Sequence, residues 1–192
     1  MSSIVSGVDY NLLFAPDSTA NTSAAILNAL YSSTPTSVGT FASTGDSLLD
    51  LKLAQKNQTA DVALVAKEPV VQQAIAAFTT AVNSATNIKT ALSNPNVQQV
   101  LLTASGLSNY IGQTALVQKA FMSDPTDPKS LVNQLGDSTL LATVQTYDFA
   151  KNGLAELKNP QILATLTNGY AEVTWRQSLN AATPGLSNAL DF

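Results

Sequence analysis

Helix-starting signals recur along this chain, and they constrain its fold more than any other feature. Asp127, Asp137 and Asn159 each stand directly before an apolar stripe. A side-chain oxygen at such a position caps the first free N–H groups of a helix. Pro160 follows Asn159, and proline is favoured at the first helical position. The pattern predicts an all-α fold, a single compact multi-helix domain over residues 46–183 with these three residues as helix caps.

Between the caps, apolar residues recur at helical spacing and predict the core. A helix that opens at Pro69 places Val71, Ile75, Phe78 and Val82 on one side. Another, from about Asn96 to Ala104, ends at Gly106, which can adopt a left-handed conformation. The residues we expect to be largely buried are Ile75, Phe78, Leu101, Leu140, Val144, Leu163, Leu166 and Val173.

The two ends of the chain differ from this helical region. Residues 1–45 are rich in Ser and Thr, and we predict a mobile or loosely packed segment with one short helix over 23–31. Polar clusters of this kind bury too little to offset the entropy of ordering. Pro184 and Gly185 end the helical region, so residues 184–192 are predicted as a C-terminal tail.

One compact apolar motif interrupts the polar N-terminal segment, formed by Tyr10, Leu12, Leu13 and Phe14. We interpret it as a candidate partner-binding motif, suited to recognition by an export machine or to docking on a neighbouring subunit. The alternative is that it packs on its own helical domain, and the sequence leaves both open.

The chain has no His and no Cys, which removes several kinds of chemistry. Imidazole and thiolate supply the usual ligands of zinc and iron sites and the usual catalytic nucleophiles and bases. We therefore expect no cofactor, no metal site and no catalytic residue of these kinds, while a pair of carboxylates that meet in space stays open.

The net charge is −4 and only 11% of residues are charged. Nucleic-acid binding needs a basic surface, so we expect none. No transmembrane segment and no cleavable signal peptide are visible. A cytoplasmic location and export without such a peptide both stay open. A surface with so little charge repulsion also leaves a homo-oligomer open.

Two clusters of charged residues are candidates for a ligand or metal site, and each can also be interpreted as a purely structural feature. Glu172 and Arg176 are four residues apart on a predicted helix and adjoin Trp175, the only tryptophan. We interpret these three residues as a structural clasp rather than a ligand site. Asp124 and Asp127 lack the further oxygen ligands of a calcium loop, so we interpret them as turn and cap residues.

The C-terminal half resembles a bacterial family of uncharacterised helical domains that is often encoded among flagellar genes. The resemblance covers roughly residues 80–180 and attaches no activity to any residue. The segments that carry it are Phe121–Leu131, Asn133–Asp137, Tyr147–Phe149 and Tyr170–Arg176.

This resemblance implies a non-enzymatic structural or assembly protein associated with the bacterial flagellum, with flagellar or export components as protein partners. Chains exported through a narrow channel tend to lack Cys and to carry a Ser-rich N-terminus without a signal peptide, as here. A second hypothesis is a cytoplasmic export helper that binds a partner helix in an apolar groove. A third is a small-molecule binder or a carboxylate-based enzyme.

Overall fold

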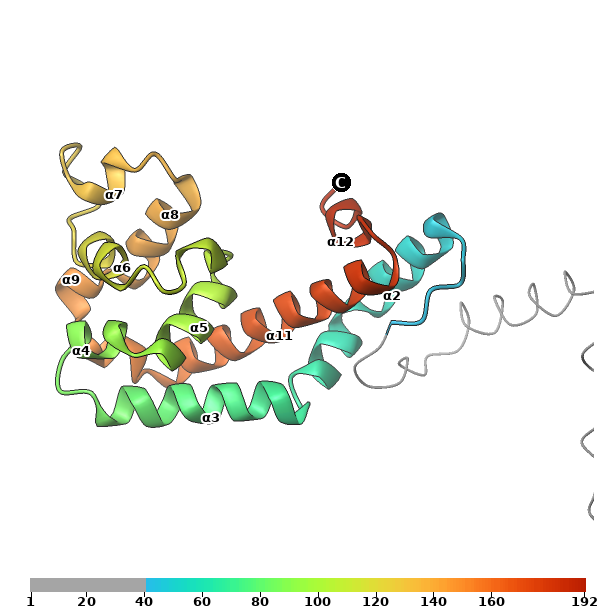
Figure 1. Ribbon diagram of the computed structural model, residues 1–192, viewed down its shortest axis with the longest axis horizontal. Helices are drawn as coiled ribbons and strands as arrows, with labels where there is room; N and C mark the ends of the chain where they lie inside the picture. Colours follow the sequence, from blue (N-terminus) through green and yellow to red (C-terminus); the bar gives the residue numbers. More distant parts are fainter. Residues whose placement is uncertain (1–40) are drawn as a thin grey trace, which may run out of the picture. The chain divides into compact units, whose positions relative to one another are not determined.

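The computed structural model of the protein describes residues 41–192, and within that range the chain forms helices, turns and loops without a strand, which confirms the all-α prediction. No helix in this range has the length and apolar character needed to cross a membrane. In chain order (Figure 1) the elements are α2 (Ser47–Val65), α3 (Pro69–Ser84), α4 (Ile88–Ser93), α5 (Pro95–Ala104), the 3-10 turn η2 (Ser108–Tyr110), α6 (Thr114–Phe121), α7 (Leu131–Gln134), α8 (Ser138–Tyr147), α9 (Phe149–Asn152), α10 (Leu154–Leu157), α11 (Pro160–Ala182) and α12 (Leu186–Ala189).

The buried apolar side chains form two clusters. The first surrounds α5 and draws on α3, α4, α6, α8 and the beginning of α11. The second joins α2, the beginning of α3, the later part of α11 and α12. Ile75 and Tyr170 pack against both clusters. Figure 1 shows α11 running from α5 to α2, so one helix connects the two clusters.

Helix α11 approaches α5 closely at Gly169. A Cβ atom at that position would lie 2.9 Å from the Ala104 carbonyl oxygen and 3.2 Å from the Ala104 Cβ. Ala104 is the last residue of α5, and the chain turns there in a Schellman motif. The Leu107 N–H donates to the Leu102 carbonyl at 2.7 Å, and Gly106 has a φ of 72°. The glycine at 169 therefore makes the helix crossing possible.

A buried glutamine, Gln98, ties three neighbouring segments to α5. Its amide nitrogen donates to the Leu92 carbonyl at 2.7 Å and to the Thr114 hydroxyl at 2.9 Å. Its amide oxygen accepts from the Gly112 N–H at 3.1 Å. Because every polar atom of this side chain is used, its burial carries no unpaired group. The end of α4 and the start of α6 are both held against α5.

The predicted core is correct for α3, α5 and α8 and in part for α11. Phe78, Leu101, Leu140, Val144 and Leu166 are buried as expected. Ile75, Leu163 and Val173 are half-buried. Beyond Leu166 the buried residues of α11 are Ala171, Trp175 and Leu179. The step of five residues after Leu166 turns the buried side of the helix, because its neighbours change from α5 to α2 and α12.

The C-terminal tail predicted over 184–192 contains a further helix, α12. Gly185 has a φ of 85°, which reverses the chain after α11. Leu186 then enters the second cluster and is only 3% exposed. The tail prediction is wrong at this point, because Pro184 and Gly185 end α11 without ending the packed structure.

Replacement of Phe78 by Ala tests the first cluster. Phe78 is fully buried, so its truncation should lower the free energy of unfolding by about 3–5 kcal/mol. Urea unfolding of the variant measures this change. Thr80→Ala on the exposed side of α3 is the control, and a loss below ~1 kcal/mol at Phe78 contradicts the packing.

Replacement of Gly169 by Ala tests the helix crossing. Alanine gains about 1 kcal/mol of helix propensity, whereas overpacking against a backbone atom costs about 1–3 kcal/mol. We expect the clash to prevail, because the Ala104 carbonyl belongs to a capped helix end. Thermal unfolding should show a destabilised Gly169→Ala variant. Thr165→Ala, on an exposed position of α11, should be neutral or stabilising, and a stabilised Gly169→Ala would show that the two helices lie further apart.

Candidate functional site

Asp50 lies in the first turns of α2 and is completely buried. Its carboxylate accepts from the Ser43 hydroxyl at 2.6 Å and from both the N–H and the hydroxyl of Thr44, at 2.8 and 2.7 Å. The Thr183 hydroxyl, at the end of α11, donates to it at 2.9 Å. One carboxylate therefore joins the residues before α2, α2 itself and the end of α11.

These bonds decide the charge of Asp50. Burial acts to raise its pKa, but the donors from Ser43, Thr44 and Thr183 together outweigh burial, so the pKa lies below its ordinary value. The carboxylate is thus held in its charged form. Residues 43–44 belong to the ordered domain, although the predicted boundary of the N-terminal segment lies at residue 45.

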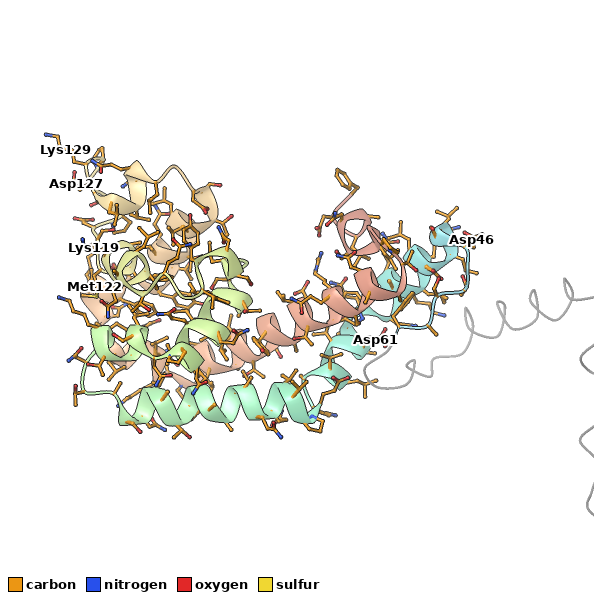
Figure 2. All side chains as sticks on the ribbon, viewed as in Figure 1. Asp46, Asp61, Lys119, Met122, Asp127 and Lys129 are labelled. Atoms are coloured by element: carbon orange, nitrogen blue, oxygen red, sulfur yellow. The ribbon has the colours of Figure 1, made fainter. Side chains whose placement is uncertain are left out.

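A second aspartate of α2, Asp61, has the opposite surroundings. It is 7% exposed, and its Oδ1 has no hydrogen-bond partner among the described residues. Burial raises the pKa of this carboxyl, and Trp175 on α11 only partly offsets the effect. Figure 2 shows Asp61 towards the end of α2 and Asp46, the N-cap, at its beginning.

Arg176 of α11 binds the C-terminal residues through hydrogen bonds and an ion pair. Its Nε lies 3.1 Å from Glu172 Oε1. Its Nη1 donates to the Ser187 carbonyl at 3.2 Å and to the Asp191 carboxylate at 3.0 and 3.2 Å. Trp175, beside it, is buried in the second cluster. The contacts of Arg176 with Ser187 and Asp191 hold α12 and the residues after it.

A hollow of about 410 Å³ lies between α2 and α11. Gln58, Thr59, Val62 and Ala63 line it from α2, and Asn168 and Glu172 line it from α11. The Gln58 amide donates to Glu172 Oε1 at 3.4 Å across the hollow. Glu172 also bonds Arg176, so the one carboxylate of the lining already has two partners.

The three predicted cap residues have different surroundings. Asn159 accepts from the Gln161 N–H at the start of α11. Asp137 accepts from the Leu140 N–H at 3.0 Å and from the Tyr110 hydroxyl at 2.9 Å. The prediction for Asp127 is wrong, because its carboxylate accepts from the Lys129 N–H within a turn, and α7 begins only at Leu131, after Ser130.

The turn around Asp127 explains the late start of α7. The Ser130 N–H bonds the Asp127 carbonyl, and the Asn133 side chain donates to the carbonyls of Pro125 and Asp127. Asp124 binds the N–H and hydroxyl of Thr126. Figure 2 shows Asp127 and Lys129 pointing away from the ribbon. Among the described residues no three Asp or Glu side chains lie close enough to hold a metal ion.

Sequence reasoning missed Asp50, Asp61 and the hollow. The buried residues of α2 are Asp50, Leu53, Ala54, Asp61 and Val65. Their spacing of three, four and seven residues is helical, so the pattern could have placed both aspartates on the inner face. The predicted partner-binding residues Tyr10, Leu12, Leu13 and Phe14 lie outside the described residues.

Comparison with known proteins supports the fold and leaves the activity open. The fold is similar to the X-ray crystal structure of protein AGR_C_984 from Agrobacterium tumefaciens, with a TM-score of 0.66 and 19% identity over 83% of this chain and 69% of that one. Residues 104–192 match the model of a family described as "Protein of unknown function (DUF1217)". The C-terminal part thus resembles an uncharacterised domain family. No curated protein matches this sequence.

Replacement of Arg176 by Lys tests the clasp. Lysine keeps the charge but cannot reach Glu172, Ser187 and Asp191 together, because it lacks the planar fork. We expect a loss of about 0.5–1.5 kcal/mol, felt mainly as faster amide exchange over residues 186–192. Glu172→Gln keeps the bonds to Ser187 and Asp191 and should leave that exchange slow. Unchanged exchange in Arg176→Lys would show that apolar packing alone holds α12.

Proposed function

We propose that this chain is a non-enzymatic structural or assembly protein associated with the bacterial flagellum, which binds a protein partner through Tyr10, Leu12, Leu13 and Phe14. The flagellar part of the proposal comes from the sequence resemblance alone. The binding part rests on the contacts by which the helical domain holds residues 41–44.

The observation that carries the proposal is the attachment of residues 43–44 to Asp50. The two residues supply three of the four hydrogen bonds to this buried carboxylate. Phe41, just before them, packs against the second cluster. The domain therefore fixes residues 41–44, which directly follow residues 1–40 in the sequence. A fixed attachment point suits a protein that presents a recognition motif to a neighbour.

The second candidate is an export helper that binds a partner helix in an apolar groove, and the hollow between α2 and α11 is the feature to compare with it. Its lining combines apolar side chains with amides and a hydroxyl, which can bond a peptide backbone. Its volume of about 410 Å³ suits a few partner side chains rather than a whole helix. An enzymatic use of Glu172 would first have to displace Gln58 and Arg176.

Removal of residues 1–40 separates recognition from folding. The cut stops before Phe41 and Ser43, because both belong to the packed domain. We expect the shortened chain to keep its thermal unfolding temperature and to lose its partners in pull-downs from motile cells. Fractionation into cell, periplasm and filament shows where each form accumulates.

Two matched variants refine this test. The full chain with Tyr10, Leu12, Leu13 and Phe14 replaced by Ser should lose its partners, as the deletion does. The full chain with the polar residues Ser32, Ser33, Thr34 and Thr36 replaced by Ala should keep them. Unfolding of the shortened chain would place the segment in the core, and unchanged pull-down and motility would refute the recognition role. Loss of binding in a Gln58→Ala and Asn168→Ala variant alone would favour the helper function.

A further inference from the structure

We propose that α2 is docked most firmly on α11 at a pH of about 4 and loosens on both sides of it, through protonation of Asp50 below and ionisation of Asp61 above. This inference does not depend on the proposed function. It starts from the composition of the buried face of α2, where two of the five buried residues are aspartates.

Few apolar side chains of α2 are buried, so the protonation states of its two buried aspartates contribute a large part of the docking free energy. Leu53, Ala54 and Val65 are the only apolar residues of α2 that are buried, and Ala54 alone is completely buried. Asp50 is docked as a carboxylate with four donors, whereas the Oδ1 of Asp61 has none among the described residues. Docking thus favours opposite protonation states of two residues on one helix.

No other charged group near this interface is a cause of the pKa shift of Asp50 or of Asp61. On α11 the charged residues are Glu172 and Arg176, which pair with each other, and Asp191 pairs with Arg176. Tyr170 of α11 packs against the second cluster. On α2 and in the turn after it, the remaining titratable residues are Asp46, Lys52, Lys56, Lys67 and Glu68, and none of them contributes to the shifts of Asp50 or Asp61.

The sign of each effect follows from proton counting. The pKa of docked Asp50 lies below its ordinary value of about 3.9, so undocking takes up a proton as the pH falls below that value. The pKa of docked Asp61 lies above the ordinary value. At any pH between the ordinary value and the docked pKa, undocking therefore releases a proton. Each proton changes the opening equilibrium by up to about tenfold per pH unit. Opening is therefore least near the ordinary aspartate value, at a pH of about 4.

Undocking exposes Trp175, which provides a direct signal. Trp175 is the only tryptophan and is 2% exposed against α2 and α12. Its emission and its quenching by acrylamide therefore report the opening of this interface. Amide exchange over residues 47–65, relative to residues 95–104 of α5, assigns the opening to α2 and removes the intrinsic pH dependence of exchange.

The test follows both signals in the full chain from about pH 2 to about pH 8. In the unmodified chain, α2 exchange and Trp175 quenching should pass through a minimum and rise on both sides. Asp61→Asn should abolish the rise on the alkaline side, leaving α2 better protected at neutral pH than in the unmodified chain. Asp50→Asn should weaken protection at every pH above the acidic edge.

Two further variants keep the proposal open to refutation. Thr183→Val removes one donor from Asp50 without changing any charge, so it should reduce the rise in opening on the acidic side, even if Asp50→Asn does not fold. Glu172→Gln should leave the alkaline edge in place. An alkaline rise that persists in Asp61→Asn, or an α2 exchange that keeps a constant ratio to that of α5 at every pH, overturns the proposal.

Discussion

The contact between Gly169 and Ala104 is the constraint on which the arrangement of the helices depends. Since a Cβ at 169 would lie 2.9 Å from the Ala104 carbonyl, α11 can cross α5 at this distance only with glycine there. The crossing fixes the direction of α11, and the later part of α11 carries Trp175 and Leu179 to the second cluster. The docking surface of α2 and α12 is thus set by a contact in the first cluster.

The two clusters are held by different means. The first has large, fully buried side chains such as Phe78, Phe121 and Phe149, and its central polar residue, Gln98, uses all of its hydrogen-bonding atoms. The second combines a smaller set of apolar residues with the polar contacts of Asp50 and Arg176. Apolar burial is insensitive to pH, whereas charged contacts depend on it and on salt. The two parts of the fold should therefore respond differently to solution conditions.

The fold was largely predictable, because its signals are local. Pro69, Asp137, Asn159 and Gly106 act through backbone groups one to five residues away, and each lies where the sequence places it. The prediction for Asp127 was wrong because a cap and a turn use the same side-chain hydrogen bond, and the contacts of Ser130 and Asn133 stabilise the turn. The turn of the buried side of α11 could not be predicted, since it depends on which helices lie beside it.

The candidate site was predictable only where its contacts are close in the chain. Glu172 and Arg176 are four residues apart, and their pairing follows from helical spacing. Asp50 meets Thr183 across 133 residues, and Gln58 meets Glu172 across 114. No local pattern brings such partners together. The same limit applies to the contact of Asp61 with Trp175, because helical spacing places Asp61 on the buried face of α2 but does not say which distant helix covers it.

These separations along the chain also bear on the order of folding. The partners of Gln98 lie 6, 14 and 16 residues away, so α4, α5 and α6 close short loops. The contacts of α2 with α11 close loops of more than a hundred residues, which costs more entropy and slows their formation. During synthesis α2 leaves the ribosome more than a hundred residues ahead of its partner on α11. Until α11 has been synthesised, the buried face of α2 lacks the surface on which it docks.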